Sequence, residues 1–345
     1  MTANLTREDM VGQVGLVVPV YYREQVPDDV CENLLRTTLA GYAGCLQPQH
    51  IVLVVDGAQR LTGLAERLSS ELACGAFRVK TLRVNQGKGG ALVVGWEELL
   101  ADEALKFIAV RDADGDHFLD DLPHLFRLGE QIVEDTGSAS VVIIGRRTAV
   151  HPSLGWRRGE CELAVNAILV EALQFSLASR GRVLPRQYWA ADVLDLQSGY
   201  KLYSRAACAV ATSALRKAEQ EGSKFQPLRY GMELIPFAAI CAAGGIAGEA
   251  PRYKEYHTQP VTNYGDVDWG SLFGDPLAWT LHTLSIDPVA ACQFFDNALA
   301  RSLMMTDPAG RRDLLTLRGH TLEKLAALWG TPLGQLPEPQ TRRFL

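Results

Sequence analysis

The central segment of the sequence is Phe107-Ile108-Ala109-Val110-Arg111-Asp112-Ala113-Asp114-Gly115-Asp116-His117. Its apolar beginning, followed by a glycine-containing turn, is typical of a buried strand and the loop after it. The three aspartates that alternate along this loop repel one another when ionised. A hard divalent cation such as Mg²⁺ or Mn²⁺ relieves that repulsion, because it prefers oxygen ligands and shares them with phosphate. The alternative interpretation of an isolated Asp-x-Asp motif is a solvated acidic turn.

Apolar runs of strand length recur along the chain, at residues 14–20, 51–55, 79–84, 141–145 and 246–250. Helix-type periodicity separates most of them, and residues 195–205 alternate apolar and polar residues, as a half-exposed strand does. Near-continuous apolar strands that alternate with helices predict an α/β fold with a mostly parallel sheet covered by helices on both faces.

Polar residues gather where the predicted strands end. In parallel sheets, ligands bind beyond the carboxyl ends of the strands, and Glu24, Asp56, Lys88 and Asp112 all fall at that edge. Lys88 lies between glycines at a predicted helix start, where backbone N–H groups and the lysine charge suit an anion. The spacing is not that of a P-loop. Asp56 could accept hydrogen bonds from a base or ribose, or it could cap a turn.

Composition narrows the classes of function. The 345 residues are 47% hydrophobic and 21% charged, and the net charge is −6 without a long basic run. We therefore expect no nucleic-acid partner. The seven cysteines form no C-x-x-C pair, which favours a reducing cytoplasmic location and argues against disulfides and zinc. No signal sequence and no transmembrane segment are expected.

Three regions are predicted along the chain. Residues 1–260 form the domain with the strand–helix alternation, residues 261–330 form a helical C-terminal region, and residues 331–345, rich in proline and charge, form a tail. The role of the C-terminal helices is open, and a homodimer is one prediction for them.

Five segments in order resemble a GT-A glycosyltransferase close to family 2, the group that includes the polyprenyl-phosphate sugar transferases. They are Val18-Pro19-Val20-Tyr21-Tyr22-Arg23-Glu24, Val54-Val55-Asp56-Gly57, Asn85-Gln86-Gly87-Lys88-Gly89-Gly90-Ala91, Asp112-Ala113-Asp114-Gly115-Asp116-His117 and Ser198-Gly199-Tyr200-Lys201-Leu202-Tyr203-Ser204-Arg205. The resemblance implies a Rossmann-like GT-A sheet. Two departures from that family bear on the lipid acceptor more than on the donor chemistry. Gly57 replaces the second acidic residue that usually follows Asp56, and the C-terminal basic motif and membrane helices of the polyprenyl-phosphate enzymes are not evident.

The later part of the chain resembles a second group, the glucosyl-3-phosphoglycerate and mannosyl-3-phosphoglycerate synthases. The pattern of that group is met by Tyr230-Gly231-Met232-Glu233 and by His257. In that group the histidine completes the metal site.

These resemblances imply a metal-dependent transfer of sugar from a GDP- or UDP-sugar to a phosphorylated or hydroxyl acceptor, either a small molecule or a lipid phosphate. They imply Mg²⁺ or Mn²⁺ on Asp114, Asp116 and His257. The donor-binding residues implied are Pro19, Val20, Tyr21, Glu24, Asp56, Gly87, Lys88, Asp112 and Arg205.

The acceptor side carries two candidate catalytic carboxylates, Asp195 and Glu233. A hydroxyl acceptor needs a general base, whereas an ionised phosphate acceptor needs none. Asp195 could be that base, could orient Lys201 or Arg205, or could form a structural ion pair. An acidic acceptor could be bound by Arg146, Arg147, Lys201 and Arg205. Two other functions stay open: a sugar-phosphate nucleotidyltransferase and a non-catalytic nucleotide-sugar-binding protein.

Overall fold

The structure, a computed structural model, describes residues 7–148, 155–221, 225–253 and 268–332. Its centre is a seven-stranded sheet with the strand order β3-β2-β1-β4-β6-β5-β7. Neighbouring strands are parallel except at β6, which runs antiparallel to both β4 and β5. The strands are β1 (Val14–Val20), β2 (Ile51–Asp56), β3 (Arg78–Leu82), β4 (Phe107–Val110), β5 (Val141–Arg146), β6 (Lys201–Ser204) and β7 (Ile246–Pro251).

The apolar strands are buried on both faces, which explains why their sequences are near-continuous apolar runs. Alternate residues of β1 enter two separate cores: Val17 packs into one, and Leu16 and Val18 into the other. One face of the sheet is covered by α2 (Asp28–Leu39), α3 (Gln59–Ala73) and α5 (Leu122–Thr136). The opposite face is covered by α4 (Lys88–Leu100), α8 (Arg205–Glu221) and α10 (Ile235–Ala242).

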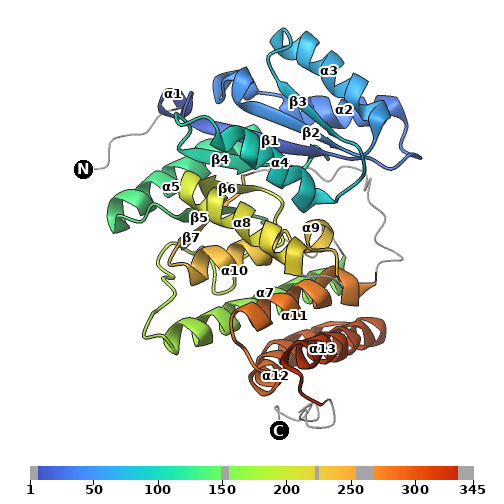
Figure 1. Cartoon of the computed structure of the whole chain (residues 1–345), viewed down its shortest axis with the longest axis vertical. Helices are drawn as coiled ribbons and strands as arrows, with labels where there is room; N and C mark the ends of the chain where they lie inside the picture. The colour runs from blue at the N-terminus through green and yellow to red at the C-terminus, as the bar shows by residue number, and fades with distance from the viewer. Residues whose placement is uncertain (1–6, 149–154, 222–224, 254–267, 333–345) are drawn as a thin grey trace.

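A further helical layer lies against α10 (Figure 1). It begins with α7 (Trp156–Ala178), which packs against the C-terminal helices and shares their apolar core. Length and composition alone would let α7 cross a membrane, but 67% of its most apolar window is buried inside the protein, a pattern that core helices also show. The C-terminal helices are α11 (Asp275–Thr283), α12 (Pro288–Met305) and α13 (Pro308–Trp329), preceded by a π-helical turn, η4 (Gly270–Gly274).

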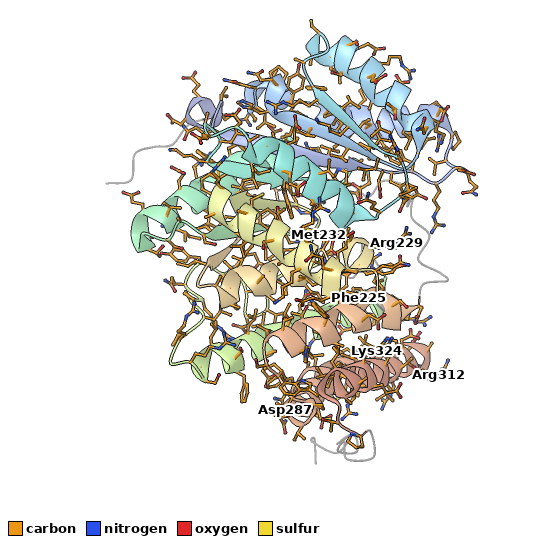
Figure 2. All side chains as sticks on the ribbon, viewed as in Figure 1. Phe225, Arg229, Met232, Asp287, Arg312 and Lys324 are labelled. Carbon is orange, nitrogen blue, oxygen red and sulfur yellow. The ribbon has the colours of Figure 1, made fainter. Side chains whose placement is uncertain are left out.

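Local sequence signals set the starts of the last two helices. Asp287, labelled in Figure 2, accepts hydrogen bonds from the backbone N–H groups of Val289 and Ala290 at 2.8 and 2.9 Å. Asp307 accepts one from Gly310 N at 2.6 Å. Each aspartate is followed by a proline at the first helical position, the pairing that starts helices efficiently.

The predicted α/β class, the mostly parallel sheet and the helical C-terminal extension are confirmed. The half-exposed strand predicted over residues 195–205 is wrong in extent and in burial. Only Lys201–Ser204 forms a strand, and all four residues are buried. The physical reason is position: β6 lies between β4 and β5, so its polar side chains face partners inside the protein. The predicted tail and His257 lie largely or wholly outside the described residues.

Candidate functional site

The acidic loop after β4 is held by two buried side chains. Arg111, 1% exposed, donates hydrogen bonds to Thr38 O at 2.6 Å and to His117 O, and so closes the loop across its base. The hydroxyl of Tyr22, which lies two residues after the end of β1, donates to Ala113 O. The loop that carries the aspartates is therefore tied to Thr38 and Tyr22, which lie in other parts of the chain.

Asp112 belongs to an ion-paired triad that joins three distant parts of the chain. Lys88 Nζ lies 2.9 Å from Asp112 Oδ1 and 3.1 Å from Glu233 Oε1. Burial alone would raise the pKa of Asp112, but Lys88 and His117 outweigh it and lower that pKa to about 2. The two carboxylates likewise outweigh burial and raise the pKa of Lys88 above its ordinary value. Asp112 and Lys88 are therefore both charged at neutral pH.

Asp114 and Asp116 form the outer part of the loop. The backbone N–H of Asp116 donates to Asp114 Oδ1 at 3.1 Å. Burial, together with the charges of Asp112 and Asp116, raises the pKa of Asp114 to about 7. The carboxylates are thus close enough to repel one another.

The donor set suits a hard divalent ion that is shared with a ligand. Within residues 7–148, 155–221, 225–253 and 268–332, no three His, Cys, Asp or Glu side chains are already arranged to hold a metal. Mg²⁺ is commonly bound through one or two carboxylates plus substrate phosphates, and Asp114 and Asp116 offer such a pair. The third predicted ligand, His257, lies outside the described residues.

The glycine-rich loop before α4 is pressed against α9 (Pro227–Tyr230). A Cβ at Gly87, where φ is +87°, would lie 2.4 Å from Arg229 Cα, and one at Gly89 would lie 2.6 Å from Leu228 O. Arg229, labelled in Figure 2, is the α9 residue that a Cβ at Gly87 would meet. Only glycine allows this approach, which brings the start of α4, with Lys88, against α9.

Asp56 holds the glycine-rich loop through hydrogen bonds to its backbone. Its carboxylate accepts hydrogen bonds from Gln86 N at 2.7 Å and from Gly87 N at 2.9 Å, one on each oxygen. Asp56 is 2% exposed, and burial raises its pKa. In this structure the carboxylate shapes the loop.

Asp195 lies in a buried ionic network. Its oxygens accept hydrogen bonds from Arg147 Nε at 2.8 Å, from Arg147 N at 3.0 Å and from Arg147 Nη2. Arg147 also contacts Glu162 at 2.8 Å, and Arg158 contacts the other oxygen of Glu162 at 2.8 Å. Burial would raise the pKa of Asp195, but Arg147 outweighs it and lowers it. The structural ion pair considered for Asp195 is the arrangement observed.

The structure brings most of the predicted site residues to one edge of the sheet. Asp56, Gly87, Lys88, Asp112 and Glu233 are linked by the contacts above. The end of β1 and the residues after it supply four more: Val20 is buried, Pro19 is half-buried, Tyr21 is 50% exposed and Glu24 is exposed.

Arg205 does not join this group. Its guanidinium donates to Asp102 O at 2.7 Å and to Leu100 O, and its backbone N–H donates to Lys106 O. Because β6 is antiparallel, Ser204 pairs with Phe107 at the amino end of β4, so Arg205 lies at the opposite edge from Asp112. The donor-binding role predicted for Arg205 is not compatible with this placement.

Sequence motifs do not reveal the two residues, Arg111 and Tyr22, that hold the acidic loop in place. Arg111 and Tyr22 carry no predicted role, although an arginine directly after a buried strand is an unusual residue that needs buried acceptors. Their partners are backbone carbonyls of Thr38, His117 and Ala113, which no side-chain motif indicates.

Comparison with known proteins adds a distant likeness. No protein-family profile and no curated protein sequence matches the chain. Among solved structures, the chain is similar to the crystal structure of S. aureus TarS 1-349, with 13% sequence identity and a TM-score of 0.38 over 92% of this chain and 90% of that chain. At this identity and TM-score, the likeness assigns neither a family nor an activity to the chain.

Proposed function

We propose that the protein is a glycosyltransferase that uses Mg²⁺ or Mn²⁺ to transfer a sugar from a nucleotide diphosphate sugar, with uridine or guanosine as the base, to a phosphorylated or hydroxyl acceptor. The observation that carries the proposal is the Lys88–Asp112 contact of 2.9 Å. It places a cation at a glycine-flanked helix start directly beside an acidic loop, at the carboxyl edge of a mostly parallel sheet. The five sequence segments that resemble GT-A enzymes, and that occur in the same order along the chain, support the same assignment.

A metal–diphosphate ligand needs both halves of this arrangement. The backbone N–H groups at the start of α4 and the ammonium of Lys88 suit the phosphate oxygens. The oxygens of Asp114 and Asp116 suit the divalent ion. When bound, such an ion supplies Lewis-acid stabilisation of the negative charge that develops on a departing diphosphate.

Side chains of the protein bind the leaving diphosphate and position the other groups in this proposal. Lys88 holds the leaving diphosphate, and the loop geometry fixed by Arg111 and Tyr22 keeps the carboxylates in place. Glu233, whose side chain is 19% exposed, is the carboxylate available to sugar or acceptor hydroxyls. Asp195 directs both oxygens to Arg147, so it stabilises the acceptor side of the site and is not our choice for the general base.

The test is a thermal-shift panel of UDP- and GDP-sugars with and without Mn²⁺. A ligand that binds the native state stabilises it by about 2.7 kcal/mol at one hundred times its dissociation constant. We expect one nucleotide class to raise the melting temperature, and to raise it further with metal. Asp114→Asn should abolish the metal-dependent part.

The matched control is Asp120→Asn, which removes a carboxylate that is 76% exposed and pairs with Arg7 on the surface. It should leave the metal-dependent shift unchanged. If no nucleotide sugar stabilises the wild-type chain with Mn²⁺, or if Asp114→Asn responds like wild type, the proposed site is wrong.

A further inference from the structure

Lys201 is a buried lysine with few partners. It lies at the start of β6, where its backbone pairs with Val110 on β4 and Ile144 on β5, and it is 4% exposed. Its ammonium donates a hydrogen bond to Ser198 O. In the part of the chain that the structure describes, no acidic side chain forms an ion pair with it, and Ser198 O is the one acceptor for its three N–H donors.

Burying a charged group without full pairing costs free energy. Burial lowers the pKa of Lys201 to about 8, so the lysine is still largely charged at neutral pH. The charged groups that influence this pKa come from four parts of the chain: Glu233 before α10, Lys88 on α4, Asp195 in the loop before β6 and Asp112 after β4. After burial itself, Glu233 is the strongest of these influences. Alternate residues of a strand share a face, and Tyr203, two residues after Lys201 in β6, packs in the core that α4 and α10 help to form. Lys201 therefore lies on the face of the sheet that is covered by α4, which carries Lys88, and by α10, which Glu233 precedes.

The triad leaves Lys88 with two tasks. In this structure Lys88 balances both Asp112 and Glu233, yet the proposed function requires the same ammonium to bind a diphosphate. When Lys88 turns to a diphosphate, Glu233 loses its only ion-paired cation among the described residues. A half-buried carboxylate without a counter-ion is costly, and that cost would oppose donor binding unless a second cation is at hand.

We propose that Lys201 is a positioning residue that becomes the counter-ion of Glu233 when Lys88 moves to the diphosphate of the donor. This inference rests on the proposed function. It assigns the buried cation a task that its present contacts do not explain, and it makes the two lysines a pair: Lys88 binds the ligand while Lys201 keeps Glu233 in place.

The test is calorimetric titration of the full chain with UDP and with GDP, each in the presence of MnCl₂. The variants are Lys201→Met, Lys201→Gln, Glu233→Gln and the two double variants. Lys201→Gln keeps an N–H donor for Ser198 O while removing the charge, so it covers the case in which Lys201→Met does not fold. Lys106→Met, which removes the charge of an exposed lysine, is the matched control.

We expect the Lys201 variants to weaken binding of the preferred nucleotide at least tenfold, and Lys106→Met to leave it within twofold. In the Glu233→Gln background, where no carboxylate needs a counter-ion, removing Lys201 should change the affinity less than twofold. If Lys201 had a purely structural role, its removal would weaken binding equally with Glu233 or Gln at residue 233, because that role does not depend on the charge of Glu233.

Two failures are distinguishable. If the wild-type chain binds neither nucleotide with Mn²⁺, the proposed function fails and this inference falls with it. If wild type binds but the Lys201 variants bind equally well, the inference alone is overturned. The same holds if they lose as much affinity in the Glu233→Gln background as they do with Glu233 in place.

Discussion

Gly199 lies directly against the carboxylate of Asp112. A Cβ at residue 199 would be 2.0 Å from Asp112 Oδ2, 2.7 Å from its Cγ and 3.1 Å from His117 Cε1. No real Cβ approaches an oxygen so closely, so the missing side chain is what lets Asp112 lie over the start of β6. The Ser-Gly pair that precedes β6 thus has a steric task in the acidic loop, in addition to any contact with an acceptor.

The first prediction follows from that contact. Gly199→Ala should push Asp112 away from Lys88 and disturb His117, which stacks on Tyr200 with ring centroids 5.3 Å apart. We expect nucleotide affinity in the presence of Mn²⁺ to fall at least tenfold, with a loss of stability of about 1–3 kcal/mol, as for other overpacked sites. Calorimetric titration and urea unfolding measure the two effects.

The control for this variant is Gly63→Ala within α3, where a Cβ meets no atom within 4 Å in the part of the chain that the structure describes, apart from the helix's own backbone. It should be neutral or stabilise the chain by about 0.5–1 kcal/mol, the usual gain of alanine over glycine in a helix. Unchanged ligand binding in Gly199→Ala would show that Asp112 does not need its observed position.

The second prediction concerns the contact between Gly87 and α9. Gly87→Ala combines backbone strain at φ +87° with a Cβ 2.4 Å from Arg229 Cα, so the loop and α9 must separate. Gly155 is a close match: it also precedes a helix, with φ +78° and ψ +157°, but a Cβ there meets no atom of the described residues within 4 Å. Gly155→Ala should cost only the strain, about 1–3 kcal/mol.

We expect Gly87→Ala to unfold at lower urea than Gly155→Ala and to lose nucleotide binding, which Gly155→Ala should retain. The difference between the two variants isolates the packing of the glycine-rich loop on α9. Equal stabilities and equal affinities would mean that this packing contributes nothing measurable.

The gathering of Asp56, Lys88 and Asp112 was predictable because it follows from topology. Asp56 ends β2, Lys88 begins the helix after β3, and Asp112 lies two residues after β4; parallel strands bring such positions to one edge. The strand boundaries at 14–20 and 107–110 were predicted as observed, because fully buried strands leave long apolar runs. The class of fold and the neighbourhood of the site were therefore accessible from local patterns.

The direction of β6 could not be predicted from such local sequence patterns. An alternating segment carries no sign of whether it runs parallel or antiparallel to its neighbours, and the long connection through α7 permits either. The placement of Arg205 depends on that direction, which explains why it lies at the opposite edge from Asp112 and not beside the other predicted donor-binding residues. Lys88 and Glu233, 145 residues apart, and Arg147 and Asp195 similarly select their partners through tertiary packing alone.

The third prediction separates two roles of Asp56. Asp56→Asn puts an amide N–H₂ against one of the two backbone donors, Gln86 N or Gly87 N, and should cost about 1–3 kcal/mol of stability. If Asp56 only shapes the loop, the affinities for UDP and GDP with Mn²⁺ should fall by the same factor. A change in the ratio of the two affinities would instead indicate that Asp56 contacts the base, as the family resemblance implies.

The fourth prediction uses the lowered pKa of Asp195. A carboxylate whose pKa is lower in the native state than its unfolded value of about 3.9 binds fewer protons when the chain is folded. Its contribution to the free energy of unfolding is therefore complete above that value and is lost as the pH falls through the native pKa.

Asp195→Asn removes a buried partner of Arg147 and should destabilise the chain by about 3–5 kcal/mol at pH 7. Urea unfolding of both proteins between pH 7 and pH 3 should show this gap constant down to about pH 5 and narrowing below it. The surface variant Asp120→Asn should differ from wild type by no more than about 1 kcal/mol throughout. A gap between Asp195→Asn and wild type that stays constant to pH 3 would mean that the Asp195–Arg147 pair does not contribute through its charge, and that the network acts by packing and neutral hydrogen bonds.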